Sequence, residues 1–281
     1  MSRGDVAVIL PAGGIGARMG QMPCGPKQLI PINGRSILAH TIAGMRLVTR
    51  VQLIVVVTSE QLLDRVCADV NNLLNEDDLP CSAAGPPEAR LLCEESDGRT
   101  SLKGAASVEV ICRPASAIDS RHSSIAHGVE HLRNRGYLFV IVHDAVRPVI
   151  PIKLIEELLC AAEEYGAAGF WVPLVSTVLR IDANGLVEDT IPRYTDEKGR
   201  LYVNSEMPQI FKYPILAKAY SLCDEHQLLH GTECLELVRR YCGVRAKMLK
   251  GDPDLLWKVT RPSDIILAES KLKPPKQKPL P

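Results

Sequence analysis

The sequence lacks three features that would each indicate a class of protein: a net charge, a long apolar run and a close pair of cysteines. Lys and Arg together number 33, as do Asp and Glu, so no overall charge would attract nucleic acid or an acidic membrane. No apolar stretch approaches the roughly 20 residues that span a bilayer, and the N-terminus lacks the apolar core of a secretory signal. We therefore expect a cytosolic protein, in which any polyanion must be held by local charge.

The nine cysteines contain no C-x-x-C pair, and most of them lie within apolar runs. This pattern argues against zinc ligation and against a disulfide framework. We interpret the cysteines as buried, reduced thiols.

What the chain of 281 residues does contain is an alternation of short apolar runs with segments of helical period. The β-α-β-α order predicts an α/β fold with a mainly parallel sheet and helices on both of its faces. The apolar runs expected to form strands include DVAVIL, VQLIVVV, VEVIC and YLFVIV, with later strands near VRAKML and LLWKV.

We predict a single domain over residues 1–273 with two special segments and a disordered tail over residues 274–281. Residues 75–107 have no periodicity and are too long for a compact connection, so we interpret them as a flexible insertion. Alternating segments separated by turn signals predict a β-hairpin arm over residues 176–210. Because so few strands are not stable alone, we expect this arm to pack against the body or a second subunit.

The glycine-rich stretch PAGGIGARMG follows the first predicted strand. It fails the dinucleotide fingerprint G-x-G-x-x-G, because Met19 stands where the third glycine is needed, and it fails the Walker A pattern as well. A glycine turn after a strand still exposes backbone N–H groups that suit phosphate oxygens, and Arg18 and Lys27 add positive charge. The alternative is a tight turn whose glycines serve only a positive φ. The nearby cations favour an anion site.

The segment HDAVRP follows the strand YLFVIV, where ligands of open α/β sheets bind. Asp144 suits a divalent cation or a hydroxyl group, and Arg147 can neutralise a phosphate. The alternative is a local ion pair between these two side chains, or a helix cap at Asp144. We interpret His143 as a packed strand residue and not as a base.

Two further positions complete the set of candidates. Arg121 and Ser124 begin a predicted helix whose N-terminal end can add to an anion or nucleobase site, although solvated residues at a helix start are the alternative. Lys258 lies in a predicted short strand, where a lysine usually faces solvent. It gains a function only if it faces the loop of Arg18 and Lys27.

Several motifs in a fixed order resemble the 2-C-methyl-D-erythritol 4-phosphate cytidylyltransferase family along nearly the whole chain. They are PAGG-x-G-x-R-M, PKQ, R-x-x-S-I-x-x-G, VHDA-x-RP, PQ-F, T-E and K-VTRP-D. The segments SEMPQ, GTECL, PLVSTV and LWKVT resemble the animal branch of this family. The bacterial and plastid branch usually has a threonine before the PQ pair, where this chain has Met207.

The resemblance implies a Rossmann-like nucleotidyltransferase fold, a homodimer whose β-arm reaches the partner's site, and a Mg²⁺-dependent reaction of CTP with a polyol phosphate. It implies residues that stabilise or position the reacting groups: Arg18, Lys27, Arg193 and Lys258. It implies contacts with CTP from Ala12, Gly13, Gly14, Gly16, Arg121, Ser124 and Asp144, with Asp144 also holding the metal. It places on the substrate side Ala145, Arg147, Thr177 and Thr232.

Several points stay open on the sequence alone. The arm arginine is assigned to Arg193, with Arg200 as the alternative, because the arm is longer here than in the family. The animal branch implies D-ribitol 5-phosphate as acceptor and CDP-ribitol as a donor for protein glycosylation. The alternatives are 2-C-methyl-D-erythritol 4-phosphate as acceptor, or an inactive nucleotide-binding scaffold. The animal branch often continues into a further C-terminal region, which is either dispensable for catalysis or missing from a shorter form.

Overall fold

A seven-stranded sheet forms the centre of the molecule. The computed structural model describes residues 5–14, 25–77, 106–193, 195–196, 198–231 and 233–272. The strands lie in the order β11-β7-β10-β6-β1-β4-β5. Their bounds are β1 (Val6–Pro11), β4 (Val51–Thr58), β5 (Ser107–Cys112), β6 (Phe139–Val142), β7 (Ala167–Pro173), β10 (Val203–Lys212) and β11 (Lys247–Lys250). All pairs are parallel except those of β10, which runs antiparallel to both β6 and β7. The predicted mainly parallel sheet is confirmed.

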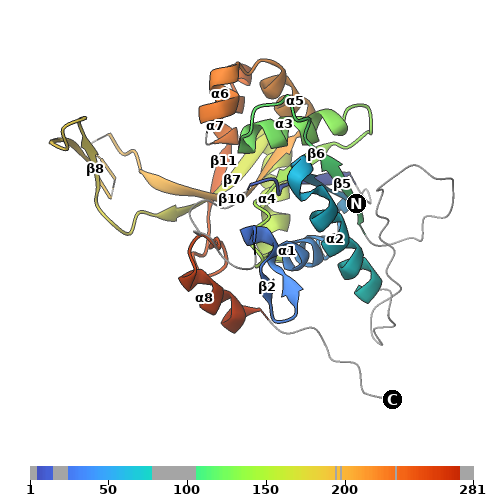
Figure 1. Ribbon diagram of the computed structural model, residues 1–281. Coiled ribbons are helices and arrows are strands. Elements are labelled where there is room, and N and C mark those ends of the chain that lie inside the picture. The colour runs from blue at the N-terminus through green and yellow to red at the C-terminus, as the bar shows by residue number, and fades with distance from the viewer. Residues whose placement is uncertain are drawn as a thin grey trace.

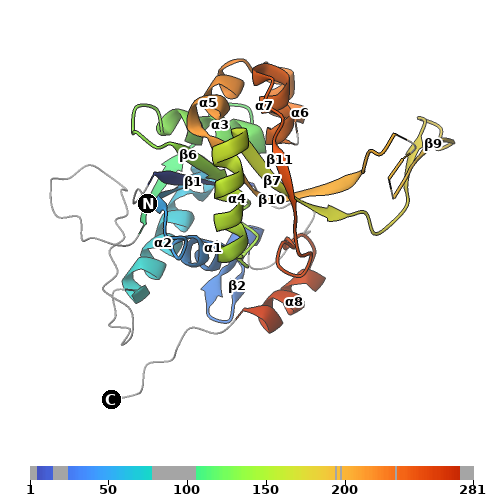
Figure 2. The same cartoon turned by 180° about the vertical axis from the view of Figure 1, so that it is seen from behind.

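Helices cover both faces of this sheet (Figures 1 and 2). One core lies between the sheet and the helices α1 (Ile37–Met45), α2 (Leu63–Asp77) and α4 (Ile152–Tyr165). The opposite core is formed with α3 (Arg121–His131), α5 (Tyr213–Ser221) and α7 (Cys234–Cys242). The short helix α6 (Glu225–His230) packs beside α3. Successive strand residues alternate between the two cores, as Val8 and Ile9 do, which explains why the strands are apolar throughout.

The predicted hairpin arm is present and projects from the body (Figure 1). It consists of β8 (Val178–Ile181) paired with β9 (Val187–Ile191), and the chain then returns to the sheet through β10. Asp182 closes the hairpin turn, since its Oδ1 accepts hydrogen bonds from the backbone N–H groups of Asn184 and Leu186. The turn also uses a positive φ at Gly185, as the Asn-Gly pair predicts.

Two small elements bring the C-terminal part of the chain next to the first third of the sequence. The hairpin of β2 (Pro31–Ile32) and β3 (Arg35–Ser36) packs against α8 (Ser263–Lys271), and the Asn33 amide donates to two carbonyls at the end of α8. The 3-10 helices η2 (Lys27–Leu29) and η3 (Glu60–Leu62) precede β2 and α2.

The expected strand near LLWKV is wrong. Residues 255–259 form a turn and an irregular segment, in which Leu256 packs into the core beside α4 and Val259 into a small core under α8. Because the two side chains enter different cores, the segment does not run along a strand edge. A backbone hydrogen bond of 3.0 Å from Val259 to Val146 holds it beside the loop that follows β6.

Parts of the other predicted segments lie outside the described residues. The expected insertion over residues 75–107 overlaps the end of α2 and the first residue of β5, its residues 78–105 lie outside the described range, and its flexibility stays a prediction. The predicted tail over residues 274–281 also lies outside the described range. In the part of the chain that is described, no helix combines the length and apolarity that crossing a membrane requires. The cytosolic location stays a prediction.

Candidate functional site

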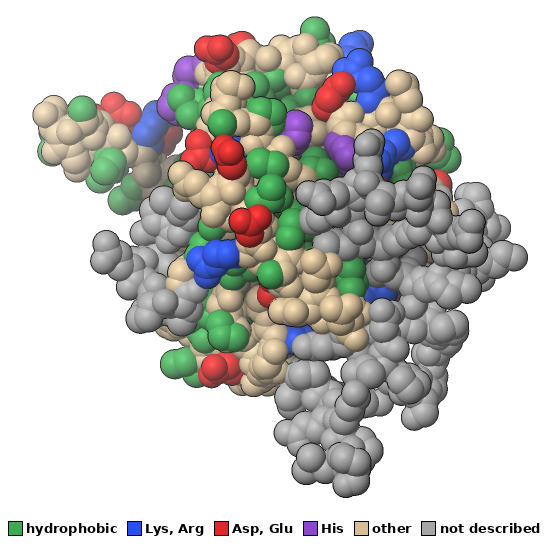
Figure 3. Space-filling model, turned by 45° about the vertical axis from the view of Figure 1, so that its right-hand side comes forward, with side chains coloured by type: hydrophobic (Ala, Val, Ile, Leu, Met, Phe, Trp, Pro, Cys, Tyr) green, Lys and Arg blue, Asp and Glu red, His purple; other side chains and the backbone are tan. Residues whose placement is uncertain are grey.

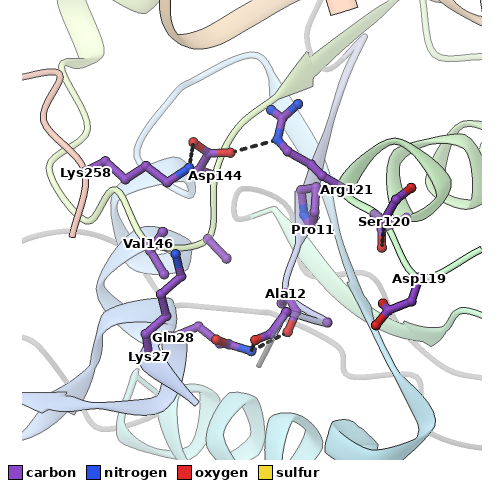
Figure 4. A pocket seen from close by; sticks show the side chains of 14 residues that line it. Pro11, Ala12, Lys27, Gln28, Asp119, Ser120, Arg121, Asp144, Val146 and Lys258 are labelled. Atoms are coloured by element: carbon purple, nitrogen blue, oxygen red, sulfur yellow. Dashed lines mark hydrogen bonds and ion pairs between the residues drawn. The ribbon is translucent and has the colours of Figure 1, made fainter. Parts of the chain in front are cut away.

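A cavity of about 400 Å³ opens beyond the carboxyl ends of β1 and β6 (Figure 4). The chain passes from β1 to β4 and β5 on one side and returns to the other side of β1 as β6. Such a reversal of strand order is where open α/β sheets bind ligands. Lining residues are Pro11, Ala12, Gly13, Gly14, Lys27, Gln28, Asp119, Ser120, Arg121, Ser124, Asp144, Ala145, Val146 and Lys258.

Asp144, which follows β6, is surrounded by three cations. Its Oδ2 accepts from Lys258 Nζ at 2.9 Å and from Arg147 Nε at 3.0 Å, while its Oδ1 accepts from Arg121 Nε at 3.0 Å. Burial alone would raise the pKa of Asp144, but Arg121, Lys258 and Arg147 together hold the pKa of this carboxyl well below its usual range. Asp144 is therefore ionised at neutral pH.

The glycine turn after β1 is fixed by the side chain of Gln28. The Gln28 amide is buried and donates to the carbonyls of Ala12, at 2.5 Å, and of Gly14, at 3.1 Å. The N–H of Ala12 donates to the carbonyl of Val57, whereas those of Gly13 and Gly14 donate to no group within the described part of the chain, which suits an anion-binding nest. Space favours glycine at position 13, because an added Cβ would lie 3.0 Å from the backbone nitrogen of Ser59.

Cationic side chains reach the cavity from three separate elements. Lys27 begins η2, Arg121 begins α3, and Lys258 precedes α8. In Figure 4 the two lysines lie on one side of the cavity and Arg121 on the other. Ser120 caps α3 by accepting a hydrogen bond from the backbone of Ser123. Because Ser120, Arg121 and Ser124 all line the cavity, the positive end of this helix lies at the cavity wall. The site is suited to a polyanion.

Most of the residues that the sequence nominated are brought together here. They are Ala12, Gly13, Gly14, Lys27, Arg121, Ser124, Asp144, Ala145 and Lys258. Gly16, Arg18 and Thr232 lie outside the described residues, so their assignments stay predictions.

Arg147 does not line the cavity, although the sequence placed it on the substrate side. It is 8 % exposed, and besides Asp144 it contacts Glu206 on β10 at 2.5 Å and the carbonyl of Leu256. Of the two interpretations left open by the sequence, the structure shows the pair with Asp144. Arg147 thus connects the base of the arm, the carboxylate and the segment that carries Lys258.

Thr177, Arg193 and Arg200 lie on the arm and do not line the cavity of their own chain. Arg193 donates to the carbonyl of Val175, whereas Arg200 pairs with Asp196 at 2.7 Å in the segment between β9 and β10. Which of these arginines acts on a substrate stays a prediction.

The histidine beside the carboxylate is not a base at neutral pH. His143 is buried, and burial lowers its pKa to about 4. Its Nε2 lies 3.1 Å from the backbone oxygen of Arg147. The neutral ring therefore has a packing position, as the sequence indicated.

A divalent cation fits this site only together with a phosphate ligand. Within the described ranges no group of three or more His, Cys, Asp or Glu side chains could hold a metal ion. Mg²⁺, however, usually takes one or two carboxylates and completes its shell with substrate phosphates and water. The ionised Asp144 lines the cavity and its Oδ1 accepts one hydrogen bond from the described residues, which leaves it a lone pair for an ion.

Two residues of this region, Gln28 and Glu206, have functions that could not be assigned from the sequence. The position of Gln28 directly after Lys27 in the PKQ motif is a sequence signal for a functional residue. Nothing in the sequence, however, indicates that its side chain contacts two carbonyls 14 and 16 positions away. No sequence signal indicates the contact of Glu206 with Arg147, because only the fold brings β10 beside the loop that follows β6.

The α/β sheet is covered by helices on both faces and has a glycine turn at the point where its strand order reverses. The cavity at this point is cationic and holds an ionised carboxylate. These features define a nucleotide-binding protein whose site suits phosphate chemistry. The chain belongs to the 2-C-methyl-D-erythritol 4-phosphate cytidylyltransferase family, whose model matches residues 6–75 and 94–274. This family is a class of nucleotidyltransferases.

Curated relatives fall into two groups. The chain is 33% identical to a D-ribitol-5-phosphate cytidylyltransferase of Xenopus tropicalis, over 96% of this chain and 57% of that protein. It is 34% identical to the Homo sapiens protein of the same name, over 95% of this chain and 51% of that protein. A 2-C-methyl-D-erythritol 4-phosphate cytidylyltransferase of Acidobacterium capsulatum is 28% identical, over 94% of this chain and 95% of that protein. The chain thus spans about half the length of its vertebrate relatives.

Solved structures share the fold. A 4-diphosphocytidyl-2C-methyl-D-erythritol synthase of Anaerococcus prevotii superposes with a TM-score of 0.66 at 20% identity, covering 95% of each chain. The 2-C-methyl-D-erythritol 4-phosphate cytidylyltransferase of Thermus thermophilus gives 0.60 at 23% identity, over 95% of this chain and 98% of that one.

Proposed function

We propose that this protein transfers a cytidylyl group from CTP to D-ribitol 5-phosphate, forming CDP-ribitol and pyrophosphate. The observation that carries the proposal is the ionised Asp144, held by Lys258 and Arg121 in one cavity with Lys27 and the glycine turn. The names of the vertebrate relatives support ribitol 5-phosphate as the acceptor. CDP-ribitol would then serve as a donor for ribitol-phosphate modification of glycoproteins.

In the proposed reaction an oxygen of the acceptor's phosphate attacks the α-phosphorus of CTP, and pyrophosphate leaves. The new bond joins that oxygen to the α-phosphorus, and the broken bond frees the β-phosphate, so no side-chain nucleophile is needed. A phosphate monoester has a second pKa of about 6 and is already ionised at pH 7, so the step needs no general base. The neutral, buried His143 agrees with this.

The reactants are both anions, so the site must neutralise their charge as they approach. We assign Lys27 and Arg18 to the triphosphate, Arg121 and Ser124 to the nucleoside, and Lys258 to the acceptor phosphate. Asp144 would hold Mg²⁺ at its free lone pair together with phosphate oxygens, where the ion would offset charge on the transferring group. The Asp144–Arg121 and Asp144–Lys258 pairs hold these cations at the cavity wall before any ligand arrives.

We further propose a homodimer in which the arm of one subunit supplies Thr177 and Arg193 to the cavity of the other. The arm exposes large apolar side chains that a monomer would leave in water, including Leu186 (66 %) and Val187 (61 %). Its projecting hairpin carries such hydrophobic side chains in Figure 3. A two-stranded hairpin gains stability when a partner covers it.

The bacterial relatives support a second acceptor, 2-C-methyl-D-erythritol 4-phosphate, because they match the chain over nearly their whole length. The experiment compares pyrophosphate release from CTP with each acceptor at equal concentrations. We expect kcat/KM for D-ribitol 5-phosphate to exceed that for the other acceptor by about tenfold or more. A higher kcat/KM for 2-C-methyl-D-erythritol 4-phosphate would make that compound the acceptor. If neither acceptor gave pyrophosphate, an inactive scaffold would be favoured.

A further inference from the structure

Arg113, which follows β5, is a buried arginine that the proposed reaction does not use. It is 6 % exposed, and its guanidinium donates to three acceptors within the next six residues: the carbonyls of Ala117 at 2.8 Å and Ile118 at 2.7 Å, and the carboxylate of Asp119 at 2.5 Å. An arginine so committed to one short segment fixes the conformation of that segment.

The fixed segment stands between Arg113 and the cavity. Asp119 and Ser120 line the cavity, whereas Arg113 does not. Figure 4 shows these two residues beside Arg121, on the side of the cavity away from Lys27 and Lys258. If the lysines hold phosphates, the side of Ser120 and Ser124 is left for the nucleoside.

The geometry of the peptide bond gives this arrangement a consequence for recognition. In a trans peptide the N–H points opposite to the preceding carbonyl, and both bonds in question are trans. Because the carbonyls of Ala117 and Ile118 point at Arg113, the N–H groups of Ile118 and Asp119 point away from it. Among the described residues neither N–H donates to another protein group.

We propose that Arg113 is a positioning residue that sets nucleobase selectivity, by holding the N–H group of Asp119, which lines the cavity, as a donor toward the base. This proposal rests on the proposed function for the place of the phosphates. Cytosine presents an acceptor at N3, whereas uracil carries a hydrogen there. A fixed donor therefore matches cytosine and faces another donor in uracil, which a site of this kind rejects.

The test measures the dissociation constants of CTP, UTP and inorganic tripolyphosphate for the full chain and for Arg113→Met. Arg50→Met is the matched control, because Arg50 likewise donates to several acceptors, on Asp5 and Glu163, but it precedes β4 and so lies at the amino-terminal ends of the parallel strands, away from the cavity. We expect Arg113→Met to weaken CTP binding about tenfold and to narrow the preference for CTP over UTP. Tripolyphosphate binding should stay within about twofold, and Arg50→Met should leave all three constants unchanged.

A folded Arg113→Met that binds CTP as tightly as the parent chain would overturn the proposal, as would equal losses for CTP and tripolyphosphate. Should Arg113→Met fail to fold, Arg113→Lys replaces it, because a single ammonium group keeps the charge but does not reach all three acceptors as the guanidinium does. We expect it to weaken CTP binding by about threefold with tripolyphosphate unchanged, and unaltered CTP binding would contradict the proposal. These are binding measurements, so absence of cytidylyl transfer would refute the proposed function without deciding the role of Arg113.

Discussion

Lys258 and Asp144 are separated by 114 positions in the sequence, yet Nζ of the lysine lies 2.9 Å from Oδ2 of the aspartate. The contact is possible because Val259 donates a backbone hydrogen bond to Val146, two residues after the aspartate. The contact places the Lys258 ammonium group at the cavity wall. There an acceptor phosphate can take the place of the Asp144 carboxylate as the partner of the lysine.

Lys258→Ala should raise KM for the polyol phosphate about tenfold or more and KM for CTP much less, because the lysine is assigned to the acceptor. Steady-state kinetics with each substrate varied in turn measures this difference. The matched control is Lys271→Ala, which removes an ion pair with Asp254 on the outer surface. A larger effect on the KM of CTP would place Lys258 on the nucleotide.

Lys27→Ala should lower turnover by roughly 10² to 10³ with little change in thermal stability, because a charge aimed at the developing phosphate charge is worth roughly 3 to 4 kcal/mol. Arg18→Ala carries the same expectation. The exposed Lys153 on α4 gives the control Lys153→Ala. Near-normal turnover of either folded variant would show that its residue has another role.

Gln28→Met should destabilise the protein by about 1 to 3 kcal/mol and weaken CTP binding, since the buried carbonyls of Ala12 and Gly14 lose their donor. Gln28→Glu should lower both stability and CTP affinity further at pH 7, because an ionised carboxylate would then face two carbonyl oxygens. Denaturant unfolding and CTP titration test both variants. If CTP affinity stays at the parent level in folded Gln28→Met, the glycine turn does not depend on this amide.

The pH dependence of stability should reflect His143. Its folded pKa of about 4 lies below the ordinary value of 6.5, so below pH 6.5 the unfolded chain binds a proton that the folded chain does not. The free energy of unfolding should therefore fall as the pH is lowered from about 6.5 to 4, by on the order of 3 kcal/mol from this residue. His122, also lowered to about 4 by burial and Arg121, acts in the same direction.

Urea unfolding at pH 7 and pH 5 measures this slope, and His143→Asn should reduce it. Asp144 contributes in a lower range, because its stabilisation is complete above the ordinary pKa of an aspartate, about 4, and is lost below that. If the slope between pH 7 and 5 were the same in the variant, His143 would not be held neutral by burial.

The dimer proposal predicts complementation between two defective subunits. Arg193→Ala removes the arm arginine and Lys258→Ala damages the cavity, so a mixed dimer contains one site with neither defect. Equimolar mixing after reversible dissociation should restore about a quarter of the parent sites. Arg200→Ala, paired with the same partner, tests the alternative arm residue, and no recovery in either mixture would contradict an arm that acts in the partner's cavity.

The α/β fold, the hairpin arm and most of the cavity could be predicted from sequence because they depend on local patterns. Apolar runs that alternate with helical periods indicate the layers, the Asn184-Gly185 pair indicates the hairpin turn, and residues directly after strands gather at one sheet edge. These rules brought Lys27, Asp144 and Arg121 into one region.

What could not be predicted depends on side chains that turn inward across the fold. Arg147 reads as a phosphate ligand, but Glu206 and Leu256, 59 and 109 positions away, hold it behind the carboxylate. The alternation in LLWKV suggests a strand, but Leu256 and Val259 enter separate cores. Neither contact leaves a periodic signal in the sequence.

The proposed reaction transfers the α-phosphate of CTP, with its cytidine, to a polyol phosphate, and a label on that phosphate follows the transfer directly. The purified chain is incubated with CTP labelled at the α-phosphate, D-ribitol 5-phosphate and Mg²⁺, and the products are separated and identified by mass. We expect the label to appear in CDP-ribitol, with an equal amount of unlabelled pyrophosphate. Label appearing in free CMP, or a complete recovery of labelled CTP, would contradict the proposed reaction.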